Sequence, residues 1–333
     1  MNLDFTFLKE DQIWGDGALD VMKKYGTKVA PTDLTVILGG YMTDDDRTSE
    51  GDLTCASWSA SSDGSWNVRC VGCGGDGFWT YSNVRKISAR PALPQKEASK
   101  ISPSEARAIG GIRVAEYGEY PQTVADDVTS EILEGLHSTR SLRQTGKNYT
   151  FDSVDLGYRN TSFKAKSFSE YEMYGKRYIR VPGRPYNDYS KLSTGEQVKK
   201  GKPYWVEVQP IEWLMDRSGT MVAKKCLFAG IQFDTKDSYD GDFSKTPMKH
   251  YLDTYFAKEM QPLERTNVKE NSTKKTDDVT MKKIKKLKMQ MLRTIAAENV
   301  SPEKGVVNPK RYWAKKQIIK AVLNRVSKGG IGK

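Results

Sequence analysis

The sequence predicts an α+β fold with small antiparallel sheets and a basic helical hairpin at its C-terminal end. Three observations predict it. Short strand-like segments are joined by turn-forming residues, which is typical of antiparallel hairpins. Other segments repeat their apolar residues at helical spacing. The last part of the chain combines narrow apolar stripes with many lysines, which indicates basic helices.

Residues 1–95 are predicted to form one unit. A helix is expected at residues 16–25, ending at Gly26, because four apolar side chains share one face: Ala18, Leu19, Met22 and Tyr25. Residues 33–38 are a short apolar run that fits a buried strand or a helical turn. Residues 68–71 and 78–81 are predicted as short strands separated by a glycine-rich turn.

A second unit is predicted at residues 111–265, after a linker at 96–110 that follows two prolines. Its first strand is expected at 114–122, ended by Pro121. An amphipathic helix follows, marked by the apolar residues Val124, Val128, Ile132, Leu133 and Leu136. Residues 171–181 are predicted as a hairpin that turns at Tyr174, Gly175 and Lys176.

Two further strands and a helix complete this unit. Apolar and polar side chains alternate at residues 204–208, which predicts a strand. The segment 210–215 follows this strand and leads to the next turn. Asp216-Arg217-Ser218-Gly219 supplies a turn before a returning strand at 221–228. Residues 247–260 are predicted as a helix with one apolar face, formed by Met248, Tyr251, Leu252, Tyr255 and Phe256.

The charge of the chain is concentrated at its C-terminal end. Residues 268–333 hold 18 Lys/Arg and 5 Asp/Glu, a balance of +13, whereas the other residues hold 35 basic and 37 acidic side chains. We expect a linker at 266–279 and two helices within 280–330, the second starting at Asn308-Pro309. Their apolar stripes are narrow, so each helix should pack on the other or on a partner.

Size and composition bound the functional class. With 333 residues, of which 37% are hydrophobic, the chain is expected to be globular with two or three domains. It has no apolar run long enough for a membrane span and no recognisable secretion signal, so a cytoplasmic or virion-associated location is expected. P-loop, GxSxG and HExxH motifs are absent, and the two histidines lie far apart. We therefore expect a protein that is not an enzyme and has no cofactor.

The most informative segment is the polar, aromatic stretch at residues 41–93. Rigid aromatics give contact area at low entropic cost, and Gly, Ser and Asn give adaptable hydrogen bonds, as in evolved recognition surfaces. A site for a protein or glycan ligand is therefore predicted at residues 58–81, with the candidates Trp58, Trp66, Asn67, Arg69, Asp76, Phe78, Trp79 and Tyr81. The competing interpretation is a glycine-rich region packed on its own aromatics, because tryptophan is usually buried.

Metal binding has less support. Cys70 and Cys73 have the CxxC spacing of metal and redox motifs, but a structural zinc site usually needs two such pairs. Asp44, Asp45 and Asp46 lack the alternating spacing of calcium loops, so a solvated acidic turn is expected there. No metal ligand is predicted, and a copper or redox enzyme that uses Cys70 and Cys73 stays an alternative.

The basic tail is a second candidate site. Its cations can neutralise phosphates, and its aromatic residues can stack on bases. Nucleic acid or an acidic protein is the expected partner of residues 280–328, with the candidates Lys282, Lys283, Lys285, Lys286, Lys288, Lys310, Arg311, Tyr312, Trp313, Lys315 and Lys316. No zinc finger, ribonucleoprotein motif or helix-turn-helix pattern accompanies them, so a solvated charged face is the competing interpretation.

Two groups of residues together resemble a known family. Residues 30–41, the aromatic stretch and Ala89-Arg90-Pro91-Ala92-Leu93 resemble the closing half of a large uncharacterised bacterial and phage family, whose members end in a variable segment followed by RPAL. Four segments resemble its opening half: residues 117–122 (YGEYPQ), 210–213 (PIEW), 226–228 and 252–256. The resemblance covers most of residues 15–260.

That family is similar to C-type-lectin-like domains of the formylglycine-generating-enzyme type, some of which are hypervariable ligand-binding proteins. The resemblance implies a mixed fold in which a small twisted sheet displays a variable surface, and residues 58–81 match that position. The enzyme branch binds copper through a cysteine pair that Cys70 and Cys73 do not match, so catalysis is not carried over. The closing half comes first here, at 1–95, and the opening half follows at 111–265, which indicates a circular permutation or a separate partial domain.

These observations favour a non-enzymatic recognition protein that is part of a larger assembly. Its lectin-like body would present residues 58–81 to a ligand, and its basic tail would anchor it. The alternative is a nucleic-acid-binding or nucleoprotein-associated factor that acts through the tail.

Overall fold

The computed structural model describes residues 3–63, 67–235 and 239–262. Both helices and strands are present, which confirms the predicted α+β class. Contacts divide the described residues into two units, residues 3–125 with 142–262, and residues 126–141. Within the described ranges, no helix is long and apolar enough to cross a membrane. The basic helices predicted at 280–330 lie outside the described residues.

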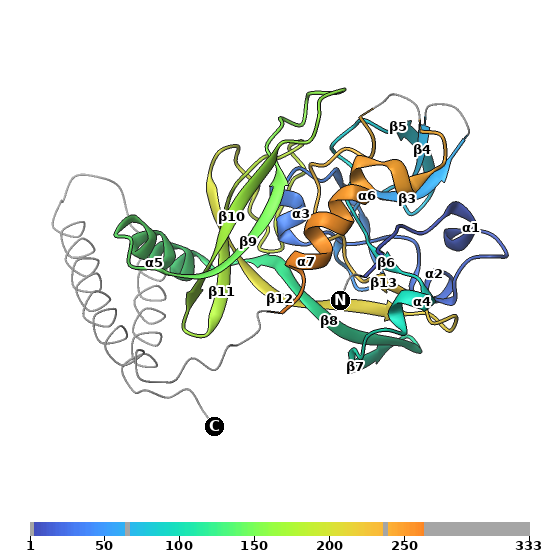
Figure 1. The fold of residues 1–333 in the computed structure, drawn as a ribbon, viewed down its shortest axis with the longest axis horizontal. Coiled ribbons are helices and arrows are strands. Elements are labelled where there is room, and N and C mark those ends of the chain that lie inside the picture. The colour runs from blue at the N-terminus through green and yellow to red at the C-terminus, as the bar shows by residue number, and fades with distance from the viewer. Residues whose placement is uncertain (1–2, 64–66, 236–238, 263–333) are drawn as a thin grey trace. The chain divides into compact units, whose positions relative to one another are not determined.

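An eight-stranded antiparallel sheet forms the centre of the first unit (Figure 1). Its strands, in the order of pairing, are β6 (Ala92–Leu93), β13 (Met221–Ala223), β12 (Pro203–Met215), β11 (Lys176–Pro182), β10 (Ala165–Met173) and β9 (Arg143–Asp152). In addition, β8 (Ile112–Val124) pairs with β12, and β7 (Ser104–Ile109) pairs with β8. Strand β12 is the axis of the sheet, because it pairs with β8 on one edge and with both β11 and β13 on the other.

Prolines lie inside the two longest strands of this sheet. Pro121 of β8 is opposite Val208, and Pro210 of β12 is opposite Glu119. The register shifts beside both prolines, and such irregularities accommodate residues that cannot donate a ladder hydrogen bond. The expectation that the first strand ends at Pro121 was therefore wrong, since β8 continues to Val124.

Two smaller sheets come from the N-terminal part of the chain. One contains β3 (Ser57–Ser62), β4 (Asn67–Val71) and β5 (Gly77–Tyr81), and the other pairs β1 (Met42–Arg47) with β2 (Leu53–Cys55). Figure 1 shows the three-stranded sheet at the end of this unit away from β10 and β11. The strands predicted at 68–71 and 78–81 are confirmed to within one residue.

The helices of the first unit are short. They are α1 (Glu10–Ile13), α2 (Asp20–Tyr25), α3 (Asp33–Ile37), α4 (Gln95–Ala98), a 3-10 turn (Phe243–Lys245), α6 (Pro247–Tyr251), a π-helical turn (Leu252–Phe256) and α7 (Ala257–Glu259). The apolar run at residues 33–38, which fitted either a buried strand or a helical turn, contains the helix α3. The Thr32 side chain caps this helix by accepting a hydrogen bond from the amide of Thr35. The helix predicted at 16–25 begins only at Asp20 and ends before Gly26, whose φ of +100° matches the predicted cap.

Helix α5 (Asp127–Ser138) belongs to the second unit. The Asp126 side chain accepts a hydrogen bond of 2.9 Å from the amide of Thr129 and caps its N-terminus. The amphipathic helix predicted after the first long strand is therefore confirmed.

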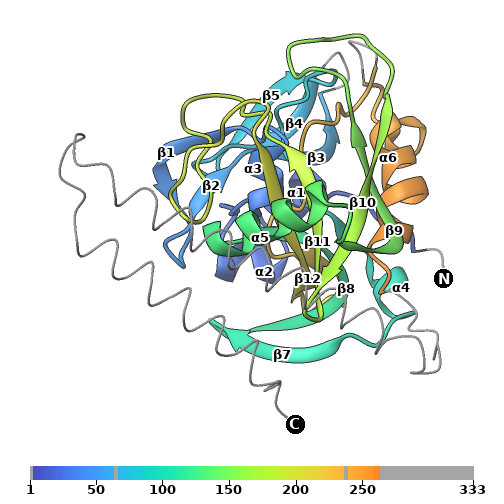
Figure 2. The same ribbon diagram turned by 90° about the vertical axis from the view of Figure 1, so that its left-hand side faces the viewer.

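The predicted hairpins are also present. Strands β10 and β11 turn at Tyr174 and Gly175, which both have positive φ, as a tight two-residue hairpin requires. Strands β12 and β13 are joined by the predicted turn after Met215, but β13 ends at Ala223. The helix predicted at 247–260 is present as α6, the π-helical turn and α7, and it lies beside β9 in both views (Figures 1 and 2).

The ARPAL segment joins distant parts of the sequence. Ala92 bridges Thr6 on one side and pairs with Val222 of β13 on the other. The buried Arg90 side chain donates from Nε to the carbonyl oxygen of Ala223 at 2.9 Å, and burial lowers its pKa. Residues before 95 and after 220 therefore share one core. The segment 96–110, predicted as a linker, carries most of α4 and all of β7.

Candidate functional site

The hairpin of β4 and β5 carries most of the residues predicted to bind a ligand. Its turn closes through a hydrogen bond of 2.7 Å from the Gly72 amide to the Asp76 carbonyl, and Gly75 has a φ of +84°. Val68 and Cys70 of β4 are fully buried. Because side chains alternate along a strand, Asn67 and Arg69 face outward.

The outward face presents two pairs of opposing residues. Arg69 lies opposite Trp79, and Asn67 lies opposite Tyr81. Trp79 is 38% exposed and Tyr81 is 48% exposed, so both rings are available to a partner. The fold therefore places two of the aromatic side chains of this segment on one exposed face of the hairpin.

Arg69 is held in a fixed position by its neighbours. Its guanidinium carbon lies 4.9 Å from the centre of the Trp79 ring and 5.4 Å from that of Trp14, and its Nε lies 3.1 Å from Glu10 Oε1. Gly77 leaves room for it, since a Cβ at that position would lie 2.4 Å from Nη2 of Arg69. The two tryptophans and the arginine thus form one ordered cluster.

A loop from another part of the chain extends this face. In residues 153–164, the guanidinium of Arg159 lies 5.3 Å from the centre of the Tyr81 ring. Tyr158 precedes it and is 62% exposed. We define the recognition surface as Trp14, Asn67, Arg69, Trp79, Tyr81, Tyr158 and Arg159. Long loops without secondary structure are often functional in compact domains.

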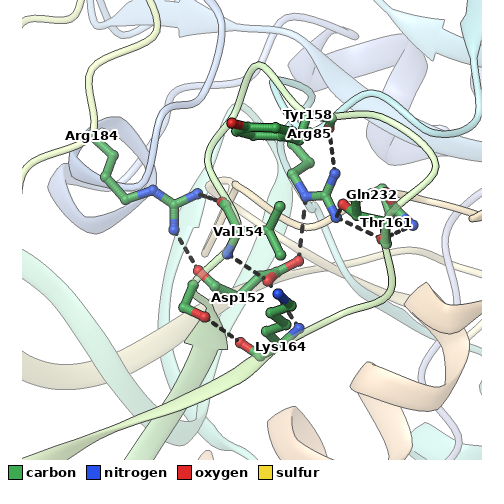
Figure 3. Close-up of polar contacts among 9 residues, drawn as sticks. Arg85, Asp152, Val154, Tyr158, Thr161, Lys164, Arg184 and Gln232 are labelled. Atoms are coloured by element: carbon green, nitrogen blue, oxygen red, sulfur yellow. Dashed lines mark hydrogen bonds and ion pairs between the residues drawn. The ribbon is translucent and has the colours of Figure 1, made fainter.

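A buried ion pair anchors this loop (Figure 3). Arg85 Nε lies 3.3 Å from Asp152 Oδ2, and both side chains are fully buried. The same guanidinium donates to the carbonyl oxygens of Tyr158 at 2.5 Å and Thr161 at 2.9 Å. Arg85 therefore joins the end of β9 to the middle of the loop that presents Tyr158 and Arg159.

Asp152 and Arg184 fix the two ends of the loop. Asp152 Oδ1 accepts from the amides of Val154 at 2.9 Å and Lys164 at 3.1 Å. Arg184 donates to the carbonyl oxygens of Asp152 and Val154, as Figure 3 shows. With charged hydrogen bonds at its start, middle and end, the loop is preorganised.

The structure separates the other predicted ligand-binding residues. Trp58 is only 2% exposed and packs 5.2 Å from the Phe233 ring, so it belongs to the core and not to the surface. Phe78 faces the core opposite Cys70 and is partly buried. Asp76 is exposed in the hairpin turn. Trp66 lies outside the described residues.

The cysteines are packed as apolar side chains. Burial raises the pKa of the Cys70 thiol well above its usual value and that of Cys73 to about 12, so neither is activated as a thiolate. Among the described residues, no group of three or more His, Cys, Asp or Glu side chains is placed to hold a metal ion. The candidates of the basic tail, at 282–316, lie outside these residues.

The surface residues that the sequence analysis missed are Trp14, Tyr158 and Arg159. All three lie outside residues 58–81, but they occur in segments of similar composition, Trp-Gly-Asp-Gly at 14–17 and Tyr-Arg-Asn-Thr at 158–161. A search for aromatic residues flanked by Gly, Asp or Asn could have found them. Nothing local indicates that these segments meet the hairpin.

A polar cleft of about 450 Å³ lies elsewhere in the first unit, lined by residues of β8, β12 and the start of α3. Its main charges compensate each other. The buried Lys224 pairs with Glu212 at 3.3 Å and with Glu50 at 3.0 Å, and Glu212 also pairs with Arg107 at 2.8 Å. Lys224 and Glu212 in the cleft wall are therefore paired with each other and with Glu50 and Arg107.

A buried carboxyl group on α7 gives the fold a pH dependence. Burial raises the pKa of Glu259 from 4.5 to about 7, and its buried Oε2 has no hydrogen-bond partner in the described structure. Lys147, whose pKa burial lowers to about 8, is the nearby cation that opposes this shift. Both groups therefore change charge near neutral pH.

Replacing Glu259 by glutamine is expected to remove part of the pH dependence of stability. Because the pKa of Glu259 is higher in the folded protein than in the unfolded chain, the protonated carboxyl contributes to the free energy of unfolding in full below about pH 4.5. This contribution is lost as the pH rises to about 7. Relative to Glu259→Gln, the wild-type protein should thus lose at most about 3 kcal/mol over this interval. Urea unfolding of both proteins at pH 4.5, 6 and 8 measures the difference, and parallel stability curves would contradict it.

Comparison of the chain with protein-family models, with curated proteins and with solved structures gives no match. The function is therefore argued from the recognition surface and its chemistry.

Proposed function

We propose that this chain is a non-enzymatic recognition protein that binds a protein or glycan ligand through the recognition surface. The observation that carries the proposal is the ordered cluster of Trp14, Arg69 and Trp79 beside the exposed Tyr81. Tryptophan, tyrosine and arginine dominate the binding energy of protein interfaces. A protein ligand is therefore favoured over a glycan.

The preorganised loop supports the same proposal. A binding surface that is fixed before the ligand arrives loses less entropy on association. Here the buried pair of Arg85 and Asp152 fixes the loop, and the pairing of β4 with β5 fixes the hairpin. The arrangement agrees with a lectin-like body that displays a variable surface on a small sheet, and we extend the proposal to that fold.

The basic tail has a separate role in this proposal. Its charge balance of +13 over residues 268–333 suits an acidic partner, such as nucleic acid or the acidic surface of a virion or another assembly. The tail would anchor the protein, and the recognition surface would select the ligand. A truncated protein, residues 1–267, should therefore keep the ligand specificity of the full chain.

Screening the full-length protein against a phage-displayed peptide library and a glycan array tests the proposed function. Replacing Trp79 by alanine should weaken any selected ligand at least about tenfold, because central aromatic anchors typically contribute about 2 kcal/mol or more. Tyr189→Ala is a matched control, since Tyr189 is as exposed as Tyr81 but outside the recognition surface. Binding measured by surface plasmon resonance that is equal for Trp79→Ala and Tyr189→Ala would contradict the proposal.

A further inference from the structure

The polar cleft of about 450 Å³ beside β8 and β12 has the size of a small-molecule site, since such sites usually measure about 300–1,000 Å³. Strands β8 and β12, which pair antiparallel, form its long wall (Figure 1). The start of α3, Ser193 and the segment 224–227 complete it. Six charged side chains of the described residues line the cleft: Asp33, Glu116, Glu207, Glu212, Lys224 and Lys225.

Four of these six charged groups have partners within the protein. Asp33 accepts hydrogen bonds from two main-chain amides, at 2.6 and 2.8 Å. Glu207 pairs with Lys176 at 2.9 Å, and Glu212 pairs with Lys224 at 3.3 Å. The charges of these four groups are therefore compensated without a ligand.

The two remaining groups have opposite charges. The Glu116 carboxylate and the Lys225 ammonium make no hydrogen bond or ion pair with any residue that the structure describes. Both side chains are partly buried, and both line the same cleft. Because they do not pair with each other, the cleft presents a separate anion and a separate cation to its contents.

The position of Glu116 gives a further reason to expect a cationic group in the cleft. Glu116 lies directly opposite Glu212 in the pairing of β8 with β12. Like charges at directly opposite positions destabilise a sheet. Lys224 and Arg107 pair with Glu212, whereas no cation of the described residues pairs with Glu116. A bound ammonium group supplies the missing positive charge.

Two glutamine side chains of the cleft also have hydrogen-bonding atoms left over. The Nε2 group of Gln122 donates to the carbonyl oxygens of Gln209 and Pro210, at 2.9 and 2.7 Å, which leaves its Oε1 as an acceptor. The Oε1 atom of Gln209 accepts from Thr123 at 2.8 Å, which leaves its Nε2 as a donor. The cleft therefore offers one neutral acceptor and one neutral donor besides the two charges.

We propose that this cleft binds a small zwitterion of the amino-acid class, with the ligand's ammonium group on Glu116 and its carboxylate on Lys225. The free amide atoms of Gln122 and Gln209 add hydrogen bonds to polar atoms of the ligand. Among the described residues, no aromatic side chain lines the cleft, so recognition depends on charge and hydrogen bonds. No residue of the recognition surface lines the cleft, and the site does not depend on the proposed function.

Saturation-transfer NMR of the full-length protein with a mixture of free α-amino acids and dipeptides tests the proposal, and isothermal titration calorimetry then gives the Kd of the strongest binder. N-acetylation of this binder removes its positive charge, and methyl esterification removes its negative charge. Each blocked ligand should bind about tenfold more weakly, because hydrogen bonds between charged groups are the strong ones. Absence of binding by every zwitterion, or a blocked ligand that binds as tightly as the free one, would overturn the proposal.

Two substitutions assign the two ends of the ligand. Glu116→Gln should weaken the zwitterion about tenfold but leave the N-acetyl ligand unchanged, since that ligand has no ammonium group. Lys225→Met should weaken the zwitterion to a similar extent and leave the methyl ester unchanged. Lys96→Met is the control, because Lys96 is exposed and does not line the cleft. Wild-type affinity in both site variants, or equal weakening of free and blocked ligands, would contradict the assignment.

The stability of Glu116→Gln separates a binding role from a structural one. The substitution removes one of two like charges at opposite positions, so the free energy of unfolding in urea should equal or exceed that of the wild type. A variant that loses affinity and is also less stable than the wild type would make Glu116 a structural part of the sheet, against the proposal.

Discussion

Replacing Arg85 by methionine is expected to lower the free energy of unfolding by about 3–5 kcal/mol. The substitution leaves the fully buried carboxylate of Asp152 without its cation, and it also removes the donors to the carbonyl oxygens of Tyr158 and Thr161. A buried charge without a partner costs far more than the loss of one surface ion pair. Urea unfolding followed by tryptophan fluorescence measures the change.

Arg107→Met is the control for this experiment. Arg107 pairs with Glu212 at 2.8 Å, but half of its side chain is exposed to solvent. Surface ion pairs contribute about 1 kcal/mol or less, so this variant should be close to the wild type. If Arg85→Met were no less stable than Arg107→Met, the buried pair would not be the anchor of the loop.

Loosening of the loop should accompany the loss of stability. Residues 153–164 should exchange their amide hydrogens faster in Arg85→Met than in the wild type, because the middle of the loop loses its attachment. Ligand binding by the recognition surface should then weaken as well, since Tyr158 and Arg159 are presented by this loop.

Replacing Gly39 by alanine is expected to destabilise the protein by about 2–5 kcal/mol. Gly39 has a φ of +96°, and a Cβ there would lie 2.7 Å from the carbonyl oxygen of Arg184 and closer still to Leu156. The Leu156 side chain can move away. The Arg184 main chain cannot easily do so, because its amide donates to the carbonyl of Ile37 at 2.8 Å.

Gly15→Ala separates backbone strain from close packing. Gly15 also has positive φ, at +75°, but no atom lies within 4 Å of its Cβ position. This variant should lose only about 1–2 kcal/mol, which is the cost of the left-handed conformation alone. Thermal unfolding of both variants gives the comparison, and equal losses would show that the contact with Arg184 is unimportant.

Much of the local structure could be predicted from the sequence. The turn at Gly175 was recognised because a two-residue hairpin needs positive φ, and the end of α2 was recognised from Gly26. The strands of the hairpin at 67–81 were found to within one residue. These features depend on backbone preferences and on the period of side chains over a few residues.

The sequence could not separate surface from core within the aromatic segment. Trp58 and Trp79 occur in similar polar surroundings along the chain, yet Trp58 packs on Phe233 and Trp79 is exposed. The difference arises because Phe233 and Tyr239 pack against the face of the three-stranded sheet that carries Trp58, whereas Trp79 lies on the opposite face. No pattern within a few residues of Trp58 indicates that Phe233 will pack against it.

The sequence by itself determined the α+β class, the main turns, and the presence of a polar, aromatic hairpin followed by a basic tail. Only the tertiary structure decided which aromatics are exposed, that Trp14 and Arg159 join the hairpin, and that Arg85 with Asp152 anchors the loop. The physical reason is distance along the chain. Turn geometry and side-chain alternation act between near neighbours, whereas burial and ion pairing depend on segments that meet only after the core has formed.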